Sequence, residues 1–186
     1  MFIQTEQTPN PATLKFIPGR TVLAEGTADF RSGEEAGGKS PLAERLFRID
    51  DVTGVFLGSD FIAVTKADAA DWPLLKPAIL GVIMEHFTAG HAVMNEGETG
   101  AGEEQYSEAD AEVVSQIKEL LETRVRPVVA QDGGDIVFHG FEQGVVLLQM
   151  RGACGGCPSA TMTLKSGIEN MLRHYIPEVT EVRAVQ

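Results

Sequence analysis

Cysteine is scarce in this chain of 186 residues, which has only Cys154 and Cys157. Two thiols cannot build the disulfide framework of a small secreted protein, so a reducing compartment is expected. No apolar run approaches the roughly 20 residues that cross a bilayer. Residues 1–7 have neither the pattern of a secretory signal nor that of an organelle presequence. These absences predict a protein of the bacterial cytoplasm, with a processed organelle protein as the less supported alternative.

Positive charge is also in short supply. The chain has 15 Lys and Arg against 27 Asp and Glu, which gives a formal net charge of −12. Such a surface repels the phosphates of nucleic acids and the headgroups of anionic membranes. We therefore expect neither nucleic acid nor membrane among the partners.

The usual constellations of catalytic residues are missing as well. The sequence contains no Ser-His-Asp set, no glycine-rich phosphate loop and no paired acids that would indicate hydrolysis or nucleotide binding. The four histidines, His86, His91, His139 and His174, are scattered along the chain, and each is predicted to be a surface or helix-capping residue. The chain is accordingly not expected to be an enzyme.

The acidic residues indicate where the chain divides. Residues 95–107 contain glutamates and glycines but no basic side chain, so they cannot bury enough apolar surface to offset their ordering entropy. We predict that they form a flexible acidic linker. It would join two small α+β domains, at residues 1–94 and 108–186.

The expected elements of the first domain follow from turn residues and apolar periodicity. Strands are predicted at 2–5, 13–17, 52–57 and 61–66, and helices at 41–48 and 72–87. Ser40 before Pro41 is typical of a helix start, and Asp71 is a candidate cap for the second helix.

The second domain is predicted to have the order α-β-β-(Cys loop)-α-β. Apolar residues at helical spacing predict one helix from about 107 to 130. Strands at 136–141 and 145–150 would form an antiparallel hairpin. A helix at 158–175 and a strand at 179–185 would complete the domain.

The two cysteines lie at the predicted turn between a strand and a helix, in the run Cys-Gly-Gly-Cys-Pro. The start of a helix presents unpaired N–H groups and a positive dipole end, both of which favour thiolate. A zinc ion or an iron–sulfur cluster usually takes four protein ligands, and Cys154 with Cys157 supplies two. If they bind metal, a second copy of the chain is the simplest donor of the others. A thiol–disulfide oxidoreductase, a structural zinc-bridged dimer and an inert cysteine pair remain as alternatives.

Charged residues near this loop have simpler interpretations. Asp132 and Asp135 flank two glycines, and a turn between helix and strand explains them better than a site for a hard metal ion. Arg151 could compensate the charge of thiolates or of a cluster, although a plain surface arginine is the favoured interpretation.

Longer runs of residues resemble a known family. The run DGGD at 132–135 and the run RGACGGCPSATMTL at 151–164 closely resemble the NifU-like C-terminal domain of the Nfu family. Residues 7–16 and 59–66 are similar to the N-terminal domain of the same family. Together these resemblances cover most of the chain outside the acidic linker.

The resemblance implies an iron–sulfur cluster scaffold or carrier. Two subunits would each contribute Cys154 and Cys157 to one shared [4Fe-4S] cluster, forming a homodimer when the cluster is bound. The cluster would then pass to apo iron–sulfur proteins. The N-terminal domain would help to select these clients or the upstream cluster-assembly factors.

Overall fold

The computed structural model describes residues 2–96, 104–153 and 158–185. The chain divides into two compact units, Met1–Gly100 and Ala101–Gln186. Each described unit contains both helices and strands, so the predicted α+β class is confirmed. Within these residues, no helix is both long enough and apolar enough to cross a membrane.

The first unit is built on a five-stranded antiparallel sheet with the strand order β1-β2-β5-β4-β3. Its strands are β1 (Gln4–Gln7), β2 (Thr13–Ile17), β3 (Ala28–Phe30), β4 (Val52–Leu57) and β5 (Ile62–Lys66). Four of the five strands were predicted, although β1 begins two residues later than expected. The short strand β3 was not predicted, because three residues are too few for a visible alternation.

Three helices accompany this sheet: α1 (Gly33–Ala36), α2 (Pro41–Phe47) and α3 (Trp72–Thr88). Ser40 caps α2 as predicted, since its hydroxyl accepts a hydrogen bond from the Ala43 amide. Asp71 precedes α3 but makes no capping hydrogen bond with its side chain. The helix α1 was not predicted.

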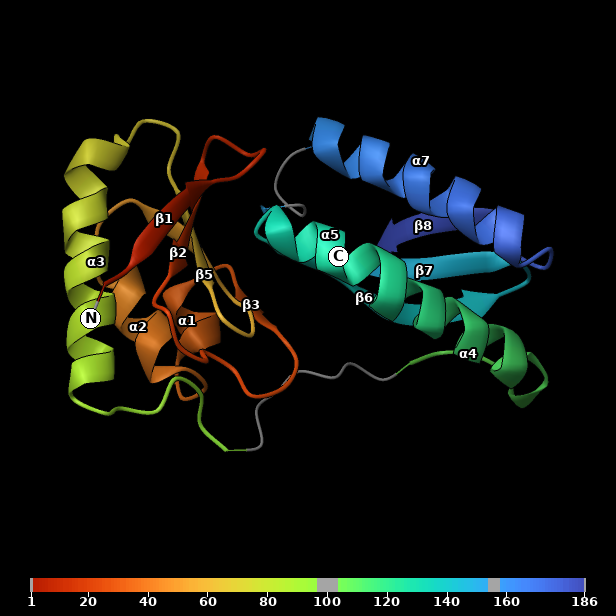
Figure 1. The fold of residues 1–186 in the computed structure, drawn as a ribbon, viewed down its shortest axis with the longest axis horizontal. Coiled ribbons are helices and arrows are strands. Elements are labelled where there is room, and N and C mark those ends of the chain that lie inside the picture. Colours follow the sequence, from red (N-terminus) through yellow and green to blue (C-terminus); the bar gives the residue numbers. More distant parts are fainter. Residues whose placement is uncertain (1, 97–103, 154–157, 186) are drawn as a thin grey trace. The chain divides into compact units, whose positions relative to one another are not determined.

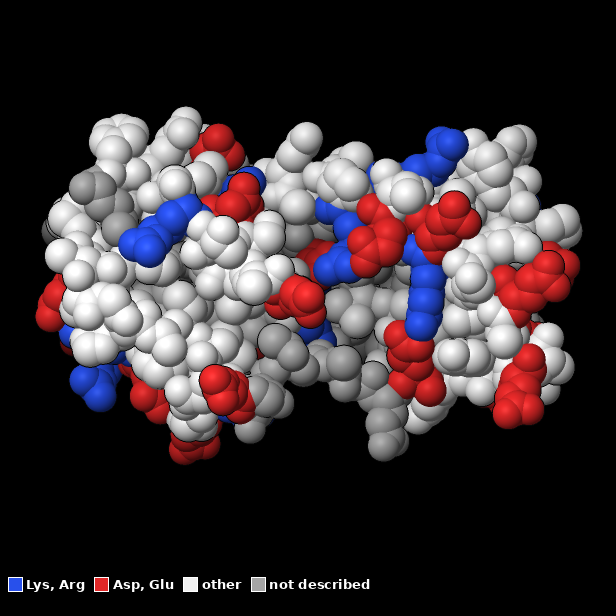
Figure 2. Space-filling view, turned by 60° about the horizontal axis from the view of Figure 1, so that its bottom comes forward, with Lys and Arg blue, Asp and Glu red and all other residues white. Residues whose placement is uncertain are grey.

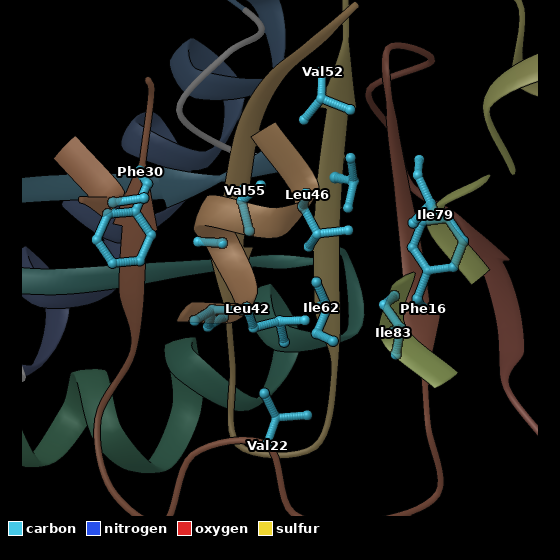
Figure 3. Close-up of a cluster of buried hydrophobic side chains, with 14 of the residues drawn as sticks. Phe16, Val22, Phe30, Leu42, Leu46, Val52, Val55, Ile62, Ile79 and Ile83 are labelled. Atoms are coloured by element: carbon cyan, nitrogen blue, oxygen red, sulfur yellow. The ribbon is translucent and has the colours of Figure 1, made fainter. Parts of the chain in front are cut away.

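The core of the first unit lies between helices and sheet (Figure 3). Leu42 and Leu46 of α2 lie over Val55 and Ile62 of the central strands, and all four are nearly inaccessible to solvent. Ile79 and Ile83 extend the same cluster from α3. This packing gives the unit a hydrophobic core of its own.

The second unit has a three-stranded sheet with helices formed by the segments before and after the hairpin (Figure 1). Its elements are η1 (Glu108–Asp110), α4 (Ala111–Leu120), η2 (Leu121–Val125), α5 (Arg126–Gln131), β6 (Gly134–Glu142), β7 (Val145–Gly152), α7 (Pro158–Tyr175) and β8 (Glu181–Val185). Strands β6 and β7 form the predicted antiparallel hairpin, and β8 pairs with β7 in parallel. The predicted order of elements is confirmed.

The first helical segment of this unit departs from the prediction of one regular helix. Between α4 and α5, Leu121–Val125 forms a π-helical turn. Pro127 has no N–H to donate to the carbonyl of Thr123 four residues earlier, and its ring crowds that carbonyl. A local π turn is one way in which a helix accommodates such a residue.

Both ends of the predicted linker are attached to the units. The amide of Asn95 donates to the Lys39 carbonyl at 2.7 Å. The amide of Gln105 donates to the His139 carbonyl, and its own carbonyl accepts from the Phe141 amide, each at 2.9 Å. Described residues at both ends of 95–107 are therefore held by hydrogen bonds, and residues 97–103 lie outside the described structure. The domain boundaries at 94 and 108 stay a prediction.

Candidate functional site

The predicted ligands Cys154 and Cys157 lie outside the described residues. The elements that flank them are described: β7 ends at Gly152, and α7 begins at Pro158. The expected change from strand to helix therefore occurs around the cysteine segment. Because α7 has 18 residues, its N-terminal end carries the positive dipole of a long helix.

The chain that enters the cysteine segment is fixed by two glycine positions. Gly152 has a φ of 67° and Gly133 has a φ of 77°. A residue with a Cβ atom adopts such values only with strain. The amide of Ala153 donates to the carbonyl of Gly133 at 3.2 Å, and Ala153 is only 3% exposed. Gly152 also faces Gly134 in the β6–β7 register. The loop after α5 thus anchors the residue directly before Cys154.

An ion pair between Arg126 and the buried Asp135 joins α5 to the start of β6, next to this loop. The side chain of Asp135, only 5% exposed, accepts hydrogen bonds from Arg126 at both carboxylate oxygens, from Nε at 2.9 Å and from a terminal nitrogen at 3.0 Å. The hydrogen bonds with Asp135 are the main cause that raises the pKa of Arg126, and Glu122 contributes further. The turn predicted for Asp132 and Asp135 is therefore present, with a structural use for Asp135.

Arg126 is a residue that sequence reasoning missed. It precedes Asp135 by nine residues, a separation that matches no helical or strand period, so no pattern pointed to the pair. Only the turn at the end of α5 brings the two side chains together.

Basic and acidic side chains are interleaved in the second unit (Figure 2). Arg151 is half-buried, and its guanidinium donates to the Gln149 side chain at 2.9 and 3.1 Å. It lies opposite Asp135 in the register of β6 and β7. The favoured interpretation as a plain surface arginine is therefore too simple, because a guanidinium is held beside the entry to the cysteine segment.

The histidines offer no metal site within the described residues. His86, expected at the surface or at a helix end, is fully buried in the first unit, and one ring nitrogen lies 2.9 Å from the Ala92 carbonyl. Burial is the main cause that lowers the pKa of His86. Across the described chain, no group of three or more His, Cys, Asp or Glu residues could hold a metal ion.

Comparison with known proteins gives two family matches. The family described as "Scaffold protein Nfu/NifU N terminal" matches residues 3–90. The family described as "NifU-like domain" matches residues 117–183. Together they cover both units of the chain.

Two relatives share the name "NFU1 iron-sulfur cluster scaffold homolog, mitochondrial". The protein from Drosophila sechellia is 53% identical over the whole chain, which covers 65% of its length. The human protein is 54% identical, and the chain covers 72% of it. The chain thus spans about two thirds of the length of these relatives.

Solved structures align with about half of the chain. A NifU-like protein from Saccharomyces cerevisiae aligns with a TM-score of 0.47 at 23% identity, over 52% of this chain and 86% of that one. A Staphylococcus aureus protein aligns with a TM-score of 0.40 at 21% identity, over 45% and 99%.

The expected location in the bacterial cytoplasm is wrong, because these relatives are named as mitochondrial proteins. Composition could not have revealed this. The packing and charge of a folded domain meet the same physical demands in either reducing compartment.

Proposed function

Because the chain belongs to the Nfu family of iron–sulfur cluster scaffold proteins, we propose that it carries a [4Fe-4S] cluster and transfers it to apo-proteins. Cys154 and Cys157 of two subunits would supply the four thiolates. The cluster is cargo, so the protein would act as a carrier and not as an enzyme. Its place of action would be the mitochondrion, as in the names of its relatives.

One observation carries this proposal: a [4Fe-4S] cluster takes four cysteine ligands, and the chain has two cysteines. No other cysteine exists in 186 residues, and the described residues contain no further group able to hold a metal. A second copy of the chain completes the ligand set without any other component. The homodimer is thus part of the proposed site.

The residues around the cysteines favour a bound anion. A cluster with four thiolate ligands carries net negative charge, which the N-terminal end of α7 and the nearby Arg151 guanidinium stabilise. The hydrogen bond from the Ala153 amide to the Gly133 carbonyl holds the residue directly before Cys154.

Transfer proceeds by ligand exchange. An incoming thiolate from the client would form a bond to iron, the bond from that iron to a carrier thiolate would break, and the released cysteine could take up a proton. Four such exchanges move the cluster without any change in its oxidation state. The first unit would select the client or the upstream assembly factor.

The test is anaerobic reconstitution with ferrous iron and sulfide. We expect one cluster per dimer, with the two cysteines of each chain as its ligands. Iron and acid-labile sulfide are assayed for the cluster, and sedimentation gives the mass of the loaded protein. Cys154→Ala and Cys157→Ala should each abolish cluster-dependent dimerisation. Loaded protein that is monomeric, or a dimer that holds zinc and resists cluster formation, would contradict the proposal.

A further inference from the structure

The second unit has two exposed aliphatic side chains that stand apart from its other exposed apolar residues. Within the described part of this unit, the exposed large apolar residues are Tyr106, Val128, Met162 and Tyr175. Tyr106 contacts the ring of Phe138, and Tyr175 lies under the guanidinium of Arg124 at 5.0 Å. Val128 is 56% exposed and Met162 is 69% exposed. Side chains this exposed leave apolar surface in contact with water, and contact with a partner would bury that surface.

Val128 lies about one helical turn from the end of α5, and Met162 lies about one helical turn from the start of α7, which follows Cys157 directly in the sequence. Val128 precedes the end of α5 by three residues, or about 4.5 Å along the helix. Met162 follows the start of α7 by four residues, or about 6 Å. The end of α5 and the start of α7 lie at the same end of the unit (Figure 1). The hydrogen bond from Ala153 to Gly133 joins these two parts of the chain.

We propose that Val128 and Met162, called here the apolar rim, contact the apolar rim of a second copy of the chain. This inference rests on the proposed function. When two copies share one cluster through Cys154 and Cys157, the start of α7 and the end of α5 of each copy, which adjoin Cys157 and the Ala153 anchor, would lie near the contact between the copies. A two-fold interface pairs the same patch on both copies.

Charge favours this patch for self-association. Each copy has a net charge of −12, so most surfaces would bring like charges together. One turn from Val128, the exposed charged side chains are Arg124 and Asp132, which have opposite signs. One turn from Met162 lies the half-buried Lys165. The border of the rim thus includes cations in an acidic chain, so two copies can meet there without bringing only negative charges together.

The experiment introduces charge into the rim of the full chain. Met162→Glu and Val128→Glu are compared with Leu74→Glu, a control at a side chain of the first unit that is 78% exposed. After anaerobic loading with iron and sulfide, sedimentation gives the dimer dissociation constant. We expect the two rim variants to raise it roughly tenfold or more, because apolar burial is lost and like charges meet. The control should behave as the original chain does.

A mixing experiment tests contact between the rims directly. One chain carries Val128→Glu with Met162→Glu, and the other carries Val128→Lys with Met162→Lys. Each should dimerise poorly alone, and an equal mixture should recover the loaded dimer, whichever rim residues face each other. Rim variants that dimerise as the Leu74→Glu control does, or a mixture that recovers nothing, would overturn the inference. An original chain that binds no cluster, or stays monomeric when loaded, would instead overturn the proposed function.

Discussion

Replacing Arg126 by methionine should selectively destabilise the second unit. The substitution keeps much of the side-chain length and removes the charge that pairs with Asp135. The Asp135 carboxylate, 5% exposed, would lose two hydrogen bonds of 2.9 and 3.0 Å and remain buried. Removing one partner of a buried pair costs about 3–5 kcal/mol. Because the Arg126 side chain is 30% exposed, water can replace part of the pair, and we expect a loss of about 2–3 kcal/mol.

The distribution of aromatic residues makes this loss measurable unit by unit. The chain has one tryptophan, Trp72 in the first unit, and its fluorescence follows that unit during denaturation in urea. Hydrogen exchange of the β6 and β7 amides follows the second unit. We expect a change in the exchange measurement alone.

The matched control is Arg183→Met. Arg183 also pairs with a carboxylate, that of Glu181, but its side chain is 60% exposed. Exposed pairs contribute little, so this variant should leave the exchange rates unchanged. If Arg126→Met lowers the free energy of unfolding by less than about 1 kcal/mol, the ion pair does not carry the stability assigned to it.

Two further predictions concern single positions. Gly140→Ala should release Gln105 from β6, because the added Cβ would lie 2.6 Å from the Gln105 carbonyl oxygen. The Phe141 amide donates to that oxygen, so its hydrogen exchange should become faster. Unchanged protection of this amide would contradict the attachment of Gln105 to β6. His86 should make the first unit less stable in acid, since burial chiefly lowers its folded pKa below the ordinary 6.5, and its stabilising contribution is present above that value and lost as pH falls through the folded pKa. Urea titrations followed by Trp72 fluorescence should show a lower free energy of unfolding of the first unit below about pH 6.5. The variant His86→Phe should show a smaller decrease. An equal pH dependence in both proteins would assign the effect to other groups.

Much of the fold could be predicted because local signals agreed with tertiary packing. Turn residues on both sides made β2 and β4 clear, and Pro158 marked the start of α7. The π turn in η2 is a response of the backbone to Pro127 that periodicity alone does not predict. The attachment of Gln105 depends on a contact with β6, which no local pattern reveals.

The sequence allows a prediction of the ligands of the candidate site, but it gives no indication of the contacts that hold the chain beside them. Cys154 and Cys157 follow from composition and spacing, and they stay a prediction because they lie outside the described residues. The hydrogen bond from Ala153 to Gly133 joins residues twenty positions apart, and the ion pair of Arg126 with Asp135 crosses a turn. Contacts of this kind depend on how the elements pack, so they appear only in three dimensions.

The attachment of Asn95 to the first unit and of Gln105 to the second limits how far apart those two points can be. The ten peptide links between them span at most about 35 Å. A partner held by the first unit would therefore meet the cysteine segment at an effective concentration on the order of millimolar. Such an encounter is a first-order process, so its rate constant would not depend on the concentration of the carrier.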